Sequence, residues 1–241
     1  MKMDTLHLNA SQVKMVAHRG LSGLETENTC SAFVAAGNRS YYGIETDVHH
    51  TADGKYVVIH DDTTKRVALD DLSVENTTYE TLRSLRLCEK NGEKGRKDLM
   101  IPSLQEYIQV CKKYEKVSVL ELKNRFKPDQ IDEIIEIIRA EGWLEHTTFI
   151  SFDLTNMICL REKLPEQKLQ YLISTYPDWL LDTLKKQKLD LDINYKALTA
   201  ERVKELHEAG IEVNVWTVDS LEDAQRMVEY GVDYITSNII E

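Results

Sequence analysis

The sequence predicts a single domain, residues 1–241, with an α/β fold: the closed (β/α)8 architecture of a TIM barrel. Three observations lead to this prediction. Short runs rich in β-forming residues alternate with amphipathic segments, as in proteins with parallel sheets. Eight such runs occur at regular intervals along the sequence, which is more typical of a closed barrel than of an open doubly wound sheet. A chain of 241 residues also has the usual length of one such barrel.

The expected strands are short apolar runs, and the segments between them have the spacing of amphipathic helices. The strands are expected at residues 13–17, 42–48, 116–122, 147–151, 168–173, 189–193, 211–216 and 232–236. The helices are expected at residues 28–37, 103–114, 128–141, 153–164, 177–186, 199–209 and 220–230. Several have end signals, such as Ser103 and Asp153 as N-caps and Gly142 and Gly231 after the last apolar position.

The regular alternation is interrupted once, between the second and third strands. After a turn at Asp53-Gly54, residues 55–60 predict a short extra strand, and a helix is expected near residues 79–85. The rest of this interval is polar and charged. Residues 61–101 are therefore expected to form a small insertion at the catalytic face of the barrel.

The composition is that of a globular protein, with 42% hydrophobic and 29% charged residues. The formal net charge of -11 argues against a nucleic-acid or anionic-membrane partner, because phosphate groups attract clustered Lys and Arg. Residues 1–10 lack the apolar core of a signal peptide, and no run has the length of a transmembrane helix. The four cysteines are widely spaced and predict neither a zinc site nor a disulfide framework, so a cytoplasmic location without stable membrane insertion is expected.

Acidic residues occupy one face of two neighbouring strands. Because alternate side chains of a strand point the same way, Glu45 and Asp47 project together into the barrel mouth, and Glu121 and Lys123 do so from the third strand. Three carboxylates at adjacent strand ends offer the hard oxygen ligands that Mg2+ and Ca2+ require. A buried salt-bridge network with Arg19 and Lys123 is the alternative interpretation.

Two histidines end apolar runs beside this cluster, and a salt-bridge network alone does not explain them. Imidazoles such as His18 and His60 can act as general base and general acid, while a divalent cation and fixed positive charges stabilise a phosphodiester transition state. His49 and His50 are interpreted as loop or packing residues. Trp216 ends the seventh strand, where its ring either walls a substrate pocket or packs in the barrel.

These residues lie in motifs that resemble those of the glycerophosphodiester phosphodiesterase family. The matching elements, in chain order, are His18-Arg19-Gly20, Glu27-Asn28-Thr29, Ala32-Phe33, Ile44-Glu45-Thr46-Asp47-Val48, Thr51-Ala52-Asp53-Gly54, Val57-Val58-Ile59-His60-Asp61, Arg66, Ile101-Pro102-Ser103-Leu104, Leu120-Glu121-Leu122-Lys123, Trp216-Thr217-Val218 and Gly231-Val232-Asp233-Tyr234-Ile235-Thr236. The resemblance covers nearly the whole chain. Thr26 stands where the family usually has proline, and the family's leucine before the arginine matched by Arg66 is missing.

The resemblance implies metal-dependent hydrolysis of small glycerophosphodiesters to glycerol 3-phosphate and an alcohol. The implied roles are binding of one divalent ion, Mg2+ or Ca2+, by Glu45, Asp47 and Glu121, acid/base catalysis by His18 and His60, and contact with the phosphate by Arg19 and Lys123. In the family's mechanism, a glycerol hydroxyl attacks phosphorus and gives a cyclic phosphate that water opens.

Two other functions compete with this one. The first is a catalytically silent barrel that binds a phosphorylated ligand, although binding alone does not need two histidines, three acids and two cations together. The second is a related enzyme of the phospholipase C or sphingomyelinase D kind, and the acidic net charge argues against work at a membrane surface.

Overall fold

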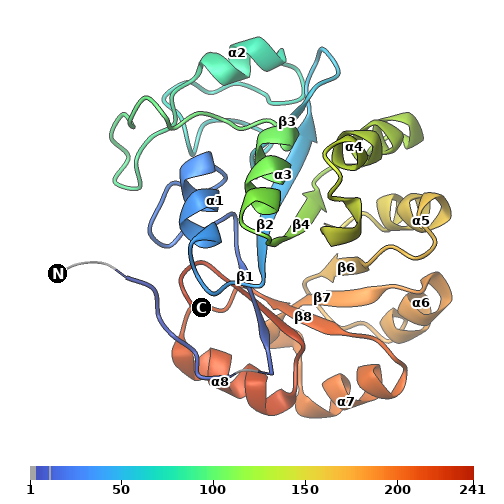
Figure 1. Ribbon diagram of the computed structural model, residues 1–241. Helices are drawn as coiled ribbons and strands as arrows, with labels where there is room; N and C mark the ends of the chain where they lie inside the picture. Colours follow the sequence, from blue (N-terminus) through green and yellow to red (C-terminus); the bar gives the residue numbers. More distant parts are fainter. Residues whose placement is uncertain (1–3, 11) are drawn as a thin grey trace.

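A closed barrel of parallel strands forms the centre of the molecule (Figure 1). The computed structural model describes residues 4–10 and 12–241, so residues 1–3 and 11 of the predicted domain lie outside the described residues. The barrel strands are β1 (Lys14–Ala17), β2 (Gly43–His50), β4 (Val117–Leu122), β5 (Thr147–Ser151), β6 (Leu169–Ile173), β7 (Asp190–Asn194), β8 (Val213–Trp216) and β9 (Tyr234–Ser237). Strand β1 pairs in parallel with both β2 and β9, which closes the barrel. The predicted (β/α)8 fold is confirmed.

The helices surround the barrel on the outside (Figure 1). They are α1 (Cys30–Gly37), α2 (Tyr79–Ser84), α3 (Leu104–Lys113), α4 (Pro128–Ala140), α5 (Leu154–Lys163), α6 (Leu180–Gln187), α7 (Ala200–Glu208) and α8 (Leu221–Tyr230), with short 3-10 turns η1 (Leu144–His146) and η2 (Tyr195–Ala197). The predicted N-caps Ser103 and Asp153 accept hydrogen bonds from backbone N–H groups of α3 and α5. None of the helices within residues 4–10 and 12–241 is both long and apolar enough to cross a bilayer.

One helix was predicted to begin too early. Asn28, expected as the first residue of a helix, has φ 52°, a left-handed conformation that a right-handed helix excludes, and α1 begins at Cys30 after the N-cap Thr29. His49 and His50 were interpreted as loop or packing residues. They do not lie in a loop, because β2 continues past the barrel and pairs with an antiparallel strand. The packing interpretation is confirmed, since His49 is buried and His50 packs edge-on against Phe126.

That extra strand is β3 (Tyr56–Val58), and its pairing with β2 confirms the short strand predicted after the Asp53-Gly54 turn. The segment that follows, residues 61–101, contains α2, which lies above the ring of helices in Figure 1. Together with Val57 and Ile59 it forms a small apolar core distinct from that of the barrel. The buried members of this core are Val57, Ile59, Val67, Ala68, Val74, Leu82, Leu87, Leu99 and Ile101.

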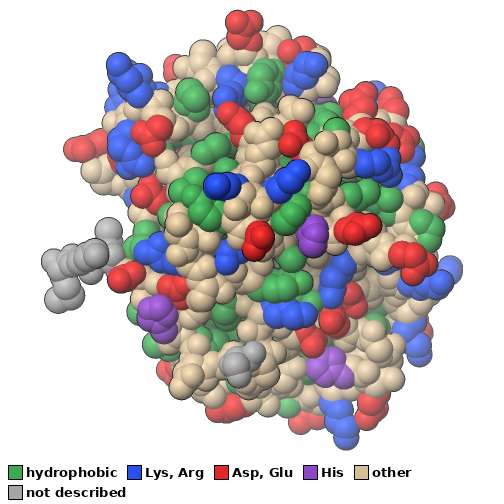
Figure 2. Space-filling view, viewed as in Figure 1, with side chains coloured by type: hydrophobic (Ala, Val, Ile, Leu, Met, Phe, Trp, Pro, Cys, Tyr) green, Lys and Arg blue, Asp and Glu red, His purple; other side chains and the backbone are tan. Residues whose placement is uncertain are grey.

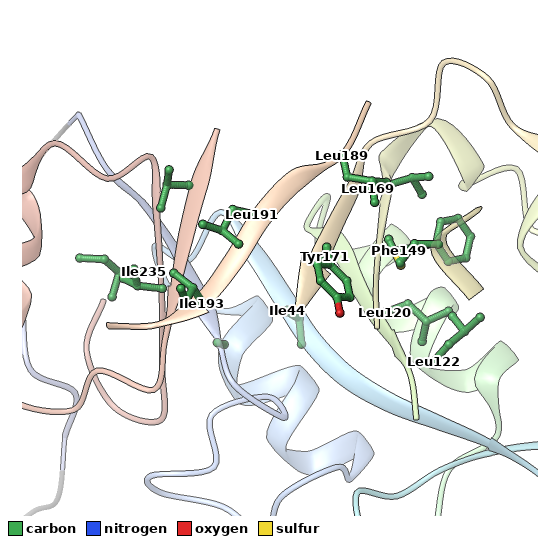
Figure 3. Close-up of a cluster of buried hydrophobic side chains, with 14 of the residues drawn as sticks. Ile44, Leu120, Leu122, Phe149, Leu169, Tyr171, Leu189, Leu191, Ile193 and Ile235 are labelled. Carbon is green, nitrogen blue, oxygen red and sulfur yellow. The ribbon is translucent and has the colours of Figure 1, made fainter. Parts of the chain in front are cut away.

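The main core lies between the strands and the helices, and it determines which side chains are left to face the barrel interior. Figure 3 shows part of this core, with Ile44, Leu120, Leu122, Phe149, Leu169, Tyr171, Leu189, Leu191, Ile193 and Ile235 labelled. Alternate residues of a strand point to opposite faces. Glu45, Glu121 and Asp192, each next to one of these apolar residues, therefore face the interior.

Candidate active site

Three carboxylates from neighbouring strands meet at the carboxyl end of the barrel. Asp47 on β2 and Glu121 on β4 are partners in the strand register, and Glu45 lies on the same face of β2 as Asp47. Each offers one oxygen, and these oxygens lie within 4.8 Å of one another. The exposed fractions are only 3% for Glu45, 1% for Asp47 and 6% for Glu121. The structure thus brings together the three acids that the strand pattern predicted on one face.

Two basic residues contact the carboxylates directly. Nζ of Lys123 lies 2.9 Å from Oε1 of Glu121 and 3.4 Å from Oδ1 of Asp47. The backbone N–H of Arg19 donates to Oε2 of Glu45 at 2.8 Å, and Nε of Arg19 lies 3.7 Å from Oδ2 of Asp47. Burial raises the pKa of Asp47, but Lys123 and Arg19 outweigh this effect and hold that pKa well below its usual value. Asp47 is therefore the charged member of the group.

The other two carboxyl groups, Glu45 and Glu121, are buried beside the negative charge of Asp47. Burial, and then the charge of Asp47, raise the pKa of Glu45 well above its usual value and that of Glu121 to about 8. Two cations face three acids here, and Arg19 also pairs with Glu27. The salt bridges of the alternative interpretation exist, but they do not compensate all the carboxylates. A hard divalent cation fits this set of donors.

Asn28 is a further member of the site, and the sequence indicated no role for it. Its side chain is buried, with Nδ2 donating to Oδ2 of Asp47 at 2.8 Å and Oδ1 accepting from Oγ1 of Thr46 at 2.7 Å. These two bonds fix the orientation of the Asp47 carboxylate. The left-handed backbone at Asn28 makes this possible, and asparagine tolerates that conformation better than most residues.

His18 follows β1 and is held by a polar network on one side of the ring. Its Nδ1 lies 2.8 Å from Oδ1 of Asn238, which also accepts from Ser22, while Nδ2 of Asn238 donates to Asp219 at 2.6 Å. From this network we infer that Nδ1 carries the hydrogen and Nε2 keeps a lone pair. Burial, and then Arg19, lower the pKa of His18 to about 4, so the ring is neutral near pH 7.

His60 belongs to a chain of charged contacts that reaches around to Arg19. Nδ1 of His60 lies 2.6 Å from Oδ1 of Asp61, and Nε of Arg66 donates to Oδ2 of Asp61 at 2.7 Å. Arg66 also donates to Glu27 at 2.7 Å through Nη1, and Glu27 accepts from Nη1 of Arg19 at 2.8 Å. His60 and Arg19 are thus oriented by a common network.

A cavity of about 100 Å³ connects these groups. His18, His60, Glu45, Glu121 and Trp216 are among the residues that line it. The indole of Trp216 packs edge-on against Phe152 with ring centroids 5.6 Å apart, so this residue both packs and walls the cavity. A second hollow, of about 490 Å³, is formed by the loop after β1 and residues 65–92, and it shares Glu27 and Arg66 with the network described above.

Comparison with known proteins identifies the family of this chain. Residues 18–241 match the Glycerophosphoryl diester phosphodiesterase family. The chain belongs to this family. A glycerophosphodiester phosphodiesterase from Caldanaerobacter subterraneus subsp. tengcongensis is 30% identical over 228 residues, which cover 93% of each protein. The expected family, and the expected class of phosphoric diester hydrolase, are confirmed.

Solved structures of the glycerophosphodiester phosphodiesterase family share the fold over almost the whole chain. A phosphodiesterase from Oleispira antarctica, solved in complex with its product sn-glycerol-3-phosphate, is 26% identical with a TM-score of 0.82, covering 93% of this chain and 92% of that one. A glycerophosphodiester phosphodiesterase from Parabacteroides distasonis is 28% identical with a TM-score of 0.79, covering 95% and 94%.

This member of the glycerophosphodiester phosphodiesterase family keeps its active-site loop in place despite the two departures from the motifs. Thr26, at the position usually held by proline, donates from Oγ1 to the backbone carbonyl of Cys88 at 2.9 Å. This bond ties the loop after β1 to the segment 61–101. Arg66 still reaches Asp61 and Glu27 without the expected preceding leucine. Both contacts compensate locally for the altered residues.

Proposed function

We propose that the chain hydrolyses glycerophosphodiesters to glycerol 3-phosphate and an alcohol, using one divalent metal ion and a pair of histidines. The observation that carries this proposal is that His18 and His60 line the same small cavity as Glu45 and Glu121. Acid/base groups, a hard-cation site and fixed positive charges are the parts that phosphodiester hydrolysis needs.

The metal ion belongs to the three buried carboxylates. Glu45, Asp47 and Glu121 would hold Mg2+ or Ca2+, because three carboxylate oxygens within 4.8 Å suit cations that prefer oxygen ligands. When bound, the ion supplies positive charge that balances the carboxylates and stabilises negative charge on the phosphoryl oxygens. Asn28 keeps Asp47 oriented for this role through its 2.8 Å hydrogen bond.

Arg19 and Lys123 would contact the substrate phosphate. Arg19 lines the cavity, both side chains are partly exposed, and each already lies against a carboxylate. Their positions are therefore set before substrate arrives, which lowers the cost of ordering them. Glu27 fixes the guanidinium of Arg19 from behind with a 2.8 Å bond to Nη1.

The two histidines share the two proton transfers of each step. One accepts the proton of the glycerol hydroxyl next to the phosphate ester while that oxygen bonds to phosphorus. The bond from phosphorus to the alcohol oxygen breaks, and the other histidine donates a proton to this oxygen. Water then opens the five-membered cyclic phosphate with the roles reversed, so each histidine returns to its starting protonation state.

Substrate class and location are proposed from separate observations. The product held by the Oleispira antarctica relative is sn-glycerol-3-phosphate, which supports a small glycerophosphodiester as substrate.

Acidic and basic side chains are interspersed on the face shown in Figure 2, which does not favour a nucleic-acid partner. Four free cysteines support a reducing, cytoplasmic location. The presence of both histidines, Glu45, Glu121 and Arg19 around one cavity argues against a silent barrel.

The test is a coupled assay for glycerol 3-phosphate with the purified protein. The substrates are glycerophosphocholine, glycerophosphoethanolamine, glycerophosphoinositol and bis-glycerophosphate, each with Mg2+, Mn2+ or Ca2+ and with EDTA. We expect release of glycerol 3-phosphate from at least one substrate and loss of activity with EDTA. The proposal is wrong if none of the substrates is hydrolysed with any of the three ions.

A further inference from the structure

The carboxylate of Glu75 connects the segment 61–101 to the two strands that carry the acid cluster. Its Oε1 accepts from Nδ2 of Asn124 at 3.0 Å and lies 3.1 Å from Nδ1 of His49, and its Oε2 lies 3.2 Å from Nε2 of His50. His49 and His50 end β2, and Asn124 closely follows β4. One side chain of the segment 61–101 thus contacts the ends of both strands.

His49 continues this connection to the backbone of His60. The side chain of His49 is fully buried, and its Nε2 lies 3.4 Å from the backbone oxygen of His60. The residue before His60, Ile59, donates its backbone N–H to the backbone oxygen of Asp47 at 3.0 Å. These two contacts attach the backbone at residues 59–60 to β2. One of them depends on the orientation of the His49 ring, which Glu75 contacts from the other side.

Glu75 is itself held in place by the segment 61–101. Its neighbour Val74 is fully buried in the small apolar core, and the backbone N–H of Val74 donates to the backbone oxygen of Asp62 at 2.9 Å. The hydrogen bond with His49 holds the pKa of Glu75 below its ordinary value, so the carboxylate is charged near pH 7. A charged acceptor forms stronger hydrogen bonds than a neutral one, so Glu75 can fix the ring of His49.

We propose that Glu75 is a positioning residue for His60, acting through His49 on the backbone from which the His60 ring extends. This inference rests on the proposed function, in which His60 transfers protons. Asp61 holds the ring directly, with its Oδ1 2.6 Å from Nδ1 of His60, and Glu75 holds the backbone. Without Glu75, the buried Nδ1 of His49 loses its acceptor, so the ring and the His60 backbone can shift. A small displacement of a proton-transfer group slows the reaction even when the substrate still binds.

The experiment measures kcat and KM for the glycerophosphodiester that the wild type hydrolyses fastest, well below the Tm of each variant. We expect Glu75→Ala to lower kcat at least about fivefold and to change KM less than about twofold, because His60 is displaced and the groups that bind the phosphate are not. Glu75→Gln keeps an oxygen that can accept from His49 and should recover most of the lost kcat. Glu80→Ala is the control. It removes an exposed carboxylate from α2 of the same segment and should match the wild type.

A double-mutant cycle tests the route through His49. His49→Leu removes the hydrogen-bonding ring and should lower kcat as Glu75→Ala does. The variant with both substitutions should be no slower than His49→Leu alone, because the two residues act in series. His50→Leu also removes a contact with Glu75 but none with His60, so its kcat should stay near that of the wild type.

Amide hydrogen exchange, followed by mass spectrometry, gives a measurement that does not depend on activity. The amides of residues 59–62 should exchange faster in Glu75→Ala than in the wild type, because local opening of this segment then costs less free energy. The amides of residues 43–47, within the barrel, should be unchanged. Glu80→Ala should show the exchange pattern of the wild type in both segments.

The outcomes separate this inference from the proposed function. If Glu75→Ala keeps the kcat of the wild type, or if the effects of Glu75→Ala and His49→Leu multiply in the double variant, the positioning role is wrong and the phosphodiesterase function stands. The role is also wrong if His50→Leu loses as much kcat as His49→Leu, since general docking of the segment then explains the loss. If the wild type hydrolyses no glycerophosphodiester, the proposed function fails and the inference fails with it. Should His49→Leu not fold, Glu75→Ala and its hydrogen exchange decide the question.

Discussion

Nδ1 of His60 lies 2.6 Å from Oδ1 of Asp61, and Arg66 holds that carboxylate from the opposite side. The hydrogen bonds of Arg66 lower the pKa of Asp61 to about 2, so Asp61 is charged throughout the neutral range. A charged carboxylate on Nδ1 fixes the ring and favours its protonated form. Asp61 is therefore a positioning residue for His60.

We expect Asp61→Asn to lower kcat by about 10- to 100-fold with a smaller change in KM, because His60 loses orientation and basicity. Burial lowers the pKa of His60 below its ordinary value, and the hydrogen bond to Asp61 partly opposes this effect, so the limb of the pH–rate profile that reports His60 should move to lower pH in the variant. Asp62→Asn is the control, since Asp62 contacts Asn124 and not His60. An unchanged kcat and pH profile in Asp61→Asn would contradict this role.

The roles of the two histidines can be separated by the leaving group. His18→Ala and His60→Ala should each lower kcat/KM for glycerophosphocholine by about 100- to 10,000-fold while leaving the Tm near that of the wild type. A p-nitrophenyl ester of glycerol phosphate has a leaving group that needs little protonation. The variant that lacks the general acid should therefore recover much of its activity on this ester, and the variant that lacks the base should not. Full activity of either variant on glycerophosphocholine would remove that histidine from the mechanism.

Metal binding can be measured without activity. We expect Mg2+ or Ca2+ to raise the Tm of the wild type, because an ion that binds only the folded protein stabilises it. Glu45→Gln and Glu121→Gln should weaken the ion's affinity at least about 10-fold, since losing a ligand costs no less than losing an outer-shell partner. Glu133→Gln is the control, because its carboxylate accepts from Tyr56 away from the acid cluster. A Tm that responds equally in all these variants would place the ion elsewhere.

The sequence predicted the acid cluster because strands have a simple geometry. The alternation of side chains along β2 and β4 places Glu45, Asp47 and Glu121 on one face whatever the loops do. Eight regularly spaced strands predicted a closed barrel. In that fold the order of the strands determines which strand ends lie next to one another. These parts of the site depend on local periodicity and on a known architecture, so they could be predicted.

The contacts that orient these groups could not be predicted in the same way. The bond from Asn28 to Asp47 depends on a left-handed backbone within a loop, and the bond from Asn238 to His18 joins opposite ends of the chain. Asp192 is different, because its signal was present: an acidic residue between Leu191 and Ile193 on a buried strand. The sequence could not show that its Oδ1 is buried without a hydrogen-bond partner, or that the residue lines the same cavity as the histidines.

The buried carboxyl group of Asp192 should also reduce the stability of the protein as the pH rises. Its pKa is raised by burial, so the folded state holds a proton that the unfolded state releases above its ordinary pKa of about 3.9. Because the folded state then binds more protons, the free energy of unfolding falls with increasing pH until the pH passes the folded pKa. Asp192→Asn removes this titration and keeps the shape of the side chain.

We therefore expect Asp192→Asn to be more stable than the wild type at pH 8, with the difference shrinking toward pH 4, where about half of the unfolded wild type is protonated at Asp192. Urea unfolding followed by circular dichroism at pH 4, 6 and 8 in the presence of EDTA measures this difference. Asn194→Ala should show a difference from the wild type that does not vary with pH. A pH-independent difference for Asp192→Asn would mean that Asp192 is ionised in the folded protein.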